Sequence, residues 1–144
     1  MRHPRLAAVI ALCMGFILAC GVDLSREQGV CLPDQVDEVA QGYISGKGLL
    51  DDGEELLVYY DNSLSLDGSD IAIVTDRRIL THRNGVTSAL DLSSIQSIER
   101  VDDVIGEAIE ASASGGQMVR VPIPPLNGLD TFEKVLRSAH ASAQ

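Results

Sequence analysis

The chain has 144 residues, of which 45% are hydrophobic, a length that suits one domain preceded by a leader. It carries 21 acidic and 11 basic residues, for a formal charge of −10, and its Lys and Arg form no cluster. Because binding to nucleic acid or to anionic lipid head groups relies on clustered basic side chains, this composition excludes nucleic acid as a partner and disfavours anionic lipid head groups.

Residues 1–19 have the pattern of a secretory signal peptide. The first five residues include Arg2, His3 and Arg5, and the apolar run that follows, 6–19, has no charged residue. That run is too short for a spanning helix, which needs about 20 residues. We therefore expect residues 1–19 to direct export and to be removed from the mature protein.

The leader stops at Cys20, within the sequence Ile17-Leu18-Ala19-Cys20-Gly21. This sequence resembles the bacterial lipobox, in which a branched, a variable and a small residue precede a cysteine. The resemblance implies lipidation of Cys20 by diacylglycerol and an acyl chain such as palmitate, which would anchor the protein stably. Gly21 is not a retention signal, so the resemblance implies an outer-membrane lipoprotein that faces the periplasm. The alternatives are ordinary cleavage near Ala19 or an uncleaved anchor.

Residues 20–32 are expected to be the lipidated cysteine and a polar tether, and residues 33–48 a short helix and loop. Within the tether, Cys31 is expected either to be a partly buried apolar residue or to form an intermolecular disulfide. Asp34 or Asp37 favours the start of the helix. Its apolar face is predicted from residues at helical spacing, which are Val36, Val39, Ala40, Tyr43 and Ile44.

Residues 49–144 consist mostly of short segments with strand periodicity, separated by turn signals. Asp67-Gly68 predicts a hairpin, and Asn84-Gly85 is the strongest hairpin signal, because a type I′ turn needs positive φ at both central residues. Prolines at 122, 124 and 125 are expected to end the sheet. The expected strands are Glu55–Leu66 with a kink at Asp61-Asn62, Ile71–Thr75, Arg78–Arg83, Val86–Leu90, Ile95–Val101, Ile105–Ala113 and Met118–Ile123.

The last segment has the pattern of an amphipathic helix. Asp130 and Glu133 have the spacing of a capping box at its start. Following about seven antiparallel strands, one such helix would plug the open end of a barrel or sandwich. Its predicted apolar stripe is Leu129, Phe132, Val135, Leu136 and Ala139.

Three segments are similar to the bacterial pleckstrin-homology-like domains: Ile71–Leu80 with its Thr-Asp-x-Arg junction, the Asn84-Gly85 turn, and Ala89–Ile98. The similarity covers roughly residues 52–141. It implies a mainly-β (α+β) fold, a bent seven-stranded β-barrel or sandwich capped by a C-terminal helix, here within residues 49–144 and after a short N-terminal helix. The family is a binding and scaffold fold without a shared activity, so the fold alone assigns no function.

Asp76, Arg77 and Arg78 form the most conspicuous charged group inside an apolar stretch. In a structural interpretation, Asp76 caps the strand junction and an arginine pairs with it. In a functional interpretation, the group contacts an anion or a partner. Phosphoinositide binding is not expected, because the first hairpin loop, Leu66–Asp70, is acidic where phosphoinositide-binding members of the wider family are basic.

The residue pattern points away from catalysis. The sequence lacks a G-x-S-x-G elbow, and neither His82, expected to be exposed on a strand, nor His140 has a metal-ligand partner at a suitable spacing. We therefore expect no enzyme activity, no cofactor and no metal site. The expected function is a membrane-tethered module that binds a protein partner or a second copy of itself. The alternative is a binder of small ligands at the barrel mouth near the C-terminal helix.

Overall fold

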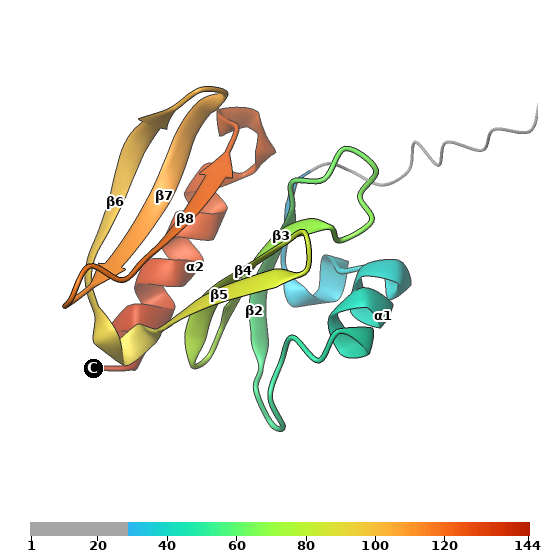
Figure 1. The fold of residues 1–144 in the computed structure, drawn as a ribbon, viewed down its shortest axis with the longest axis horizontal. Helices are drawn as coiled ribbons and strands as arrows, with labels where there is room; N and C mark the ends of the chain where they lie inside the picture. Colours follow the sequence, from blue (N-terminus) through green and yellow to red (C-terminus); the bar gives the residue numbers. More distant parts are fainter. Residues whose placement is uncertain (1–28) are drawn as a thin grey trace, which may run out of the picture.

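The computed structural model describes residues 29–144, so the predicted leader and Cys20 lie outside the described residues and stay predictions. Within the described range, eight strands form two antiparallel sheets, followed by a C-terminal helix (Figure 1). The predicted mainly-β α+β fold class is confirmed. No helix among these residues is long and apolar enough to cross a membrane.

One sheet has the strand order β1-β2-β3-β4-β5, and the other has the order β6-β7-β8. The strands are β1 (Val30–Cys31), β2 (Leu56–Asp61), β3 (Asp70–Thr75), β4 (Arg78–Arg83), β5 (Val86–Asp91), β6 (Ile95–Asp103), β7 (Gly106–Ala113) and β8 (Met118–Ile123). The α-helices are α1 (Glu38–Gly46) and α2 (Leu129–Ser142), and the 3-10 turns are η1 (Pro33–Gln35), η2 (Leu92–Ser94) and η3 (Pro125–Asn127).

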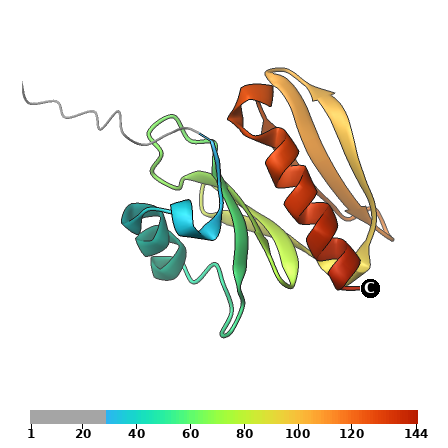
Figure 2. The same cartoon turned by 180° about the vertical axis from the view of Figure 1, so that it is seen from behind.

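The middle strands of the larger sheet are buried on both faces, which explains the continuous apolar run in β3. Alternate residues of a strand point to opposite faces. Ala72 and Val74 face the core shared with the second sheet and α2, whereas Ile71 and Ile73 face a second core beneath α1. Residues 33–48 therefore cover the outer face of the sheet, as the views from both sides show (Figures 1 and 2).

Of the two residues expected to favour the start of helix α1, Asp34 and Asp37, the second caps it. The Oδ1 atom of Asp37 accepts a hydrogen bond from the Ala40 amide at 2.8 Å, which satisfies one free N–H of the first turn. Ala40 and Ile44 are buried as predicted. Val39 was expected on the same face but is exposed, since the contact with the sheet covers a narrower stripe of this helix.

Helix α2 has the predicted apolar stripe but not the predicted capping box. Its buried residues are Leu129, Phe132, Leu136 and Ala139. The residue before its first turn is Gly128, at φ 90°, where a Cβ atom would lie 2.9 Å from the Cβ of Val30. Asp130 and Glu133 instead form ion pairs with Arg100 on β6, so their carboxylates are used between elements rather than at the helix start.

Strand β2 ends at Asp61, five residues earlier than the expected end at Leu66. The buried Asp61 carboxylate accepts hydrogen bonds from the backbone N–H groups of Ser63 and Gly68, at 2.9 and 3.0 Å. These bonds fold residues 62–69 into a compact loop in place of the expected strand end. The Asn84-Gly85 turn is confirmed, with φ 51° and 79°.

The predicted tether, residues 20–32, includes a strand near its end in the structure. Val30 and Cys31 form β1, which pairs with β2 and is the eighth strand beside the seven expected. Cys31 is half-buried against the core beneath α1, and its thiol donates to the Gly29 carbonyl, with 3.7 Å between sulfur and oxygen. This contact agrees with the partly buried interpretation of Cys31.

Candidate functional site

The most ordered polar cluster lies at the β3–β4 junction, around the charged group that the sequence singled out. Arg78 donates two hydrogen bonds to the Glu54 carboxylate, from Nε to Oε1 and from Nη2 to Oε2, both at 2.8 Å. The Thr75 hydroxyl donates to the same Oε1 at 2.6 Å, and the Asp51 amide donates to Oε2 at 2.8 Å. The Glu54 side chain is fully buried by these partners.

This cluster keeps the Glu54 carboxyl ionised in spite of its burial. Burial by itself would raise the pKa of Glu54, but the hydrogen bonds from Arg78, Thr75 and Asp51, with the Arg78 charge, lower it from 4.5 to about 2. The bidentate pair occupies the Nε–Nη2 edge of the guanidinium, so Arg78 fixes the loop that precedes β2.

Asp76 and Arg77 serve the same junction in other ways. The Oδ1 atom of Asp76 accepts a hydrogen bond from the Glu55 amide at 2.9 Å, and Arg77 donates to the Gly53 carbonyl at 3.1 Å. The expected cap by Asp76 is thus present, but the strong arginine pair is with Glu54. These contacts support the structural interpretation of Asp76, Arg77 and Arg78.

His82 was expected to be exposed, and this expectation is wrong. Its side chain is buried on β4, where the ring meets that of Tyr43 edge-on, with 5.8 Å between the ring centroids. Nδ1 lies 2.8 Å from the Thr87 hydroxyl, and Nε2 has no hydrogen-bond partner among residues 29–144. The cause is α1, because it covers a face of the sheet that the strand pattern alone leaves open.

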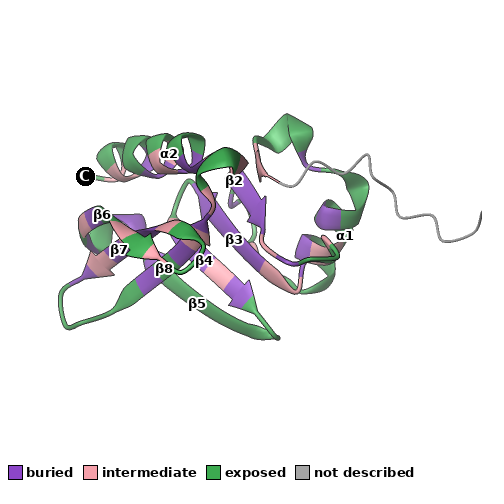
Figure 3. Ribbon diagram, turned by 90° about the horizontal axis from the view of Figure 1, so that it is seen from above, coloured by how far each residue is buried: buried purple, intermediate pink, exposed green. Residues whose placement is uncertain are grey.

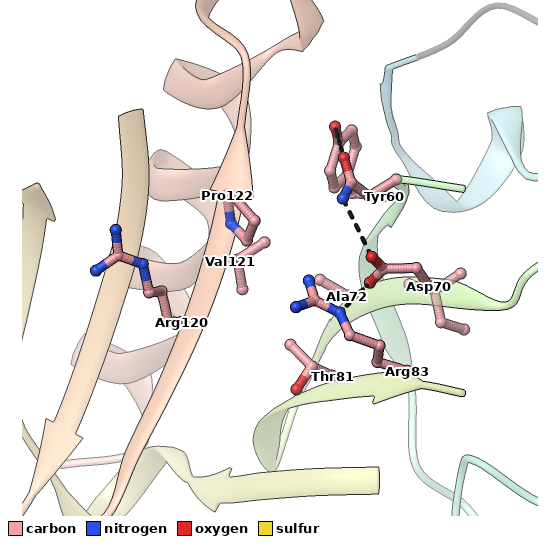
Figure 4. Close-up of a pocket in the computed structure, with 10 residues that line it drawn as sticks. Tyr60, Asp70, Ala72, Thr81, Arg83, Arg120, Val121 and Pro122 are labelled. Carbon is pink, nitrogen blue, oxygen red and sulfur yellow. Dashed lines mark hydrogen bonds and ion pairs between the residues drawn. The ribbon is translucent and has the colours of Figure 1, made fainter. Parts of the chain in front are cut away.

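An open hollow with a free space of only about 10 Å³ lies between β8 and the strands β3 and β4 (Figure 4). Val121 and Pro122 line one side, and Asp70 and Arg83 the other. Arg83 forms an ion pair with Asp70 at 3.0 Å, and Arg120 points away from this pair, as Figure 4 shows. A space of this size holds about one water molecule, so this hollow, with its arginine neutralised, is poorly suited to a small ligand.

The barrel mouth proposed for a small ligand is occupied by the protein itself. Phe132 and Leu136 of α2 are both fully buried, in one cluster with residues of both sheets. Within the described residues, no three His, Cys, Asp or Glu side chains gather where they could hold a metal ion.

Strand β5 is an open edge of the larger sheet. It pairs with β4 on one side and is the last strand in the hydrogen-bonded order. Residues 86–89 are exposed, as the view from above shows (Figure 3), and residues 86–90 include no charged residue and no proline. Edge strands of stable monomers are usually protected by shortness, charge or proline, so β5 is unusually ready to accept another strand.

The other three edges of the two sheets are protected in these ways. Strand β1 has two residues. Strand β6 carries Glu99, Arg100 and Asp102, and β8 carries Arg120 and Pro122. Among the four edges in the described part of the chain, β5 is therefore the one best suited to strand addition.

Sequence reasoning missed two features of the candidate site: the role of Glu54 at the β3–β4 junction and the edge position of β5. Glu54 lies in a run of acidic residues that resembles any exposed turn, and only the distance to Arg78 reveals its role. The edge position of β5 depends on the strand order, although its uncharged sequence, Val86-Thr-Ser-Ala-Leu90, could have drawn attention.

No protein-family model matches the chain, and no curated protein matches it.

Proposed function

We propose that this chain is a non-enzymatic, membrane-tethered interaction module of the pleckstrin-homology-like type. Seven strands, β2 to β8, followed by one helix that closes the core, agree with the arrangement that the sequence resemblance implies. The uncharged open edge of β5 is the observation that carries the interaction function. The ordered contacts of the β3–β4 junction and the filled barrel mouth leave this edge as the best binding surface.

The partner of this edge is a protein segment in extended conformation, or a second copy of the chain. An added strand would bond to the backbone groups of β5 that face away from β4. Exposed side chains of residues 86–89 would then select the partner by shape, without charge pairing. The acidic loop after β2 and the negative net charge favour a protein partner over nucleic acid or a phosphoinositide.

A photocrosslinking residue placed at Ser88 in the full chain is expected to give adducts of discrete mass in cells. Adding Val86→Lys should reduce their yield about tenfold, since a loss of ~1.4 kcal/mol in strand pairing changes binding tenfold. The matched control is the same crosslinker at Ser138, which is exposed on α2. Mass spectrometry of the adducts measures both. Equal yields from the two positions, with a monomeric mass in solution, would contradict the proposal.

The tether is tested separately at Cys20. We expect the wild-type chain to fractionate with membranes and its mature N-terminus to have the mass of an acylated cysteine. Cys20→Ser should move most of the protein to the soluble fraction, because the acyl chains supply the stable attachment. Cys31→Ser is the matched control and should leave fractionation unchanged. Identical fractionation of wild type and Cys20→Ser would disprove the tether.

A further inference from the structure

Exposed apolar side chains gather at one end of the molecule. Val104 and Leu126 are 100% exposed, Leu64 is 96% exposed, and Ile105 is 52% exposed. They lie in the β6–β7 turn, in η3 and in the β2–β3 loop, all of which are at the top of Figure 1 and again at the top of Figure 2. We call Val104, Ile105 and Leu126, the side chains of the β6–β7 turn and of η3, the apolar end.

The described chain begins at this same end. A Cβ atom built on Gly29 would lie 3.6 Å from the Asn127 carbonyl oxygen of η3, and Val30 packs on Gly128. The β6–β7 turn is joined to η3 as well, because a Cβ atom on Gly106 would lie 2.8 Å from Pro125 Cδ. The first described residues, η3 and the β6–β7 turn are therefore one contiguous surface.

The length of chain before Gly29 limits how far this surface can lie from the anchor. Nine peptide steps separate Cys20 from Gly29. Even fully extended, they span at most about 30 Å. A lipid on Cys20 therefore keeps Gly29, beside the apolar end, within about 30 Å of the bilayer, whereas no such limit applies to the far end of the domain, where α2 finishes (Figure 1).

We propose that the apolar end rests on the lipid surface, with Val104, Ile105 and Leu126 inserted at the boundary between head groups and acyl chains. This inference rests on the proposed tether at Cys20. Three side chains give little binding alone, but the anchor makes the contact intramolecular and raises its effective concentration. Strand β5 lies below this end in Figure 1, so the orientation leaves its edge open to a partner.

The charges around the apolar end indicate which lipids it contacts. Residues 124–128 of η3 and its flanks are uncharged, whereas Asp102, Asp103 and Glu107 flank the β6–β7 turn. Arg120 forms an ion pair with Asp103 at 2.7 Å and with Glu110, which leaves this region acidic. We therefore expect contact with zwitterionic lipid, weakened as the anionic fraction of the bilayer rises.

The chain has no Trp, so a single introduced Trp is an unambiguous probe. Purified full-length protein with Leu126→Trp or Val104→Trp is reconstituted on vesicles of brominated phosphatidylcholine. Inserted side chains lie about 5–10 Å below the surface, near the bromines, so these probes should lose roughly half of their emission. The matched controls are Met118→Trp and Val39→Trp, which replace exposed apolar residues elsewhere and should keep their emission.

A second measurement avoids the attraction of Trp itself to membranes. Amide hydrogen exchange of the wild-type chain on vesicles, compared with Cys20→Ser in solution, should show protection confined to residues 102–107 and 126–127. Flotation with the vesicles is measured first. If the wild type does not float, the tether fails and the orientation fails with it.

If the protein floats but the probes at 104 and 126 are quenched no more than the controls, the orientation is overturned while the tether stands. If the protection of these residues depends on protein concentration and the lipid does not quench the probes, the apolar end is an interface with a second copy of the chain. That outcome would overturn the proposal. Protection in a chain that keeps its leader, and not in the mature protein, would assign the apolar end to residues 1–19 and also overturn the proposal.

Discussion

Phe132→Ala is expected to lower the free energy of unfolding by about 3–5 kcal/mol. Phe132 is fully buried in α2, and the ring packs in the cluster that α2 shares with both sheets. Removing the ring leaves a cavity that neither sheet can fill without breaking its own strand pairing. Such a loss is a large fraction of the stability of a domain of this size.

The matched control is Leu126→Ala, which truncates an apolar side chain that is fully exposed. Its free energy of unfolding should stay within about 0.5 kcal/mol of wild type. Urea denaturation of both variants, followed by circular dichroism, measures the difference. A loss at Phe132 no larger than at Leu126 would show that α2 does not close the core.

Arg78→Met is expected to cost about 3 kcal/mol at pH 7, because it leaves the Glu54 carboxylate buried without its cation. The cost follows from the pKa of Glu54. The change from 4.5 to about 2 on folding corresponds to roughly 3 kcal/mol of favourable interaction with the ionised form. Removing Arg78 removes the largest part of that interaction, while the hydrogen bonds from Thr75 and Asp51 remain.

The contribution of Glu54 to the pH dependence of stability should change sign between the wild type and Arg78→Met. In the wild type the folded pKa of Glu54 is below the unfolded value, so its contribution is complete above pH 4.5 and is lost as the pH falls towards 2. In Arg78→Met, burial is opposed by fewer partners, so the pKa rises. The cost of the substitution should therefore shrink as the pH falls from 7 to 4, and thermal unfolding across this range measures it.

The double variant Glu54→Gln/Arg78→Met separates the buried charge from packing. It leaves no uncompensated carboxylate, so we expect it to be more stable at pH 7 than Arg78→Met alone, with little dependence on pH at this site. Glu54→Gln alone supplies the fourth corner of the cycle. Equal stability of Arg78→Met and the double variant would contradict the role assigned to the ion pair.

The parts of this fold that follow from local pattern could be predicted from the sequence. Periodicity located α2 and its buried face, and the Asn84-Gly85 signal located a hairpin whose φ angles are those of a type I′ turn. These features depend on neighbouring residues, so a short window of sequence contains what determines them. The mainly-β fold class followed from the number and spacing of such windows.

The parts that depend on distant contacts could not be predicted in this way. Strand β1 needs β2 as its partner, and the burial of His82 needs α1 above the sheet. Glu54 and Arg78 lie 24 residues apart, so their pairing has no local signal. Similarly, the capping box expected at Asp130 competes with Arg100, a cation on another element, and the ion pair with Arg100 prevails.

The order of the elements, with α2 after the strands of both sheets, has a consequence for when the core can form. Synthesis proceeds from the N-terminus, so residues 129–142 emerge after the strands of both sheets. Until they emerge, the residues of both sheets that pack on Phe132 and Leu136 lack their cover. The domain therefore cannot complete its core before α2 emerges, and in the export that we propose this delay would keep the preceding strands unfolded, and so able to pass a narrow channel, until α2 follows them.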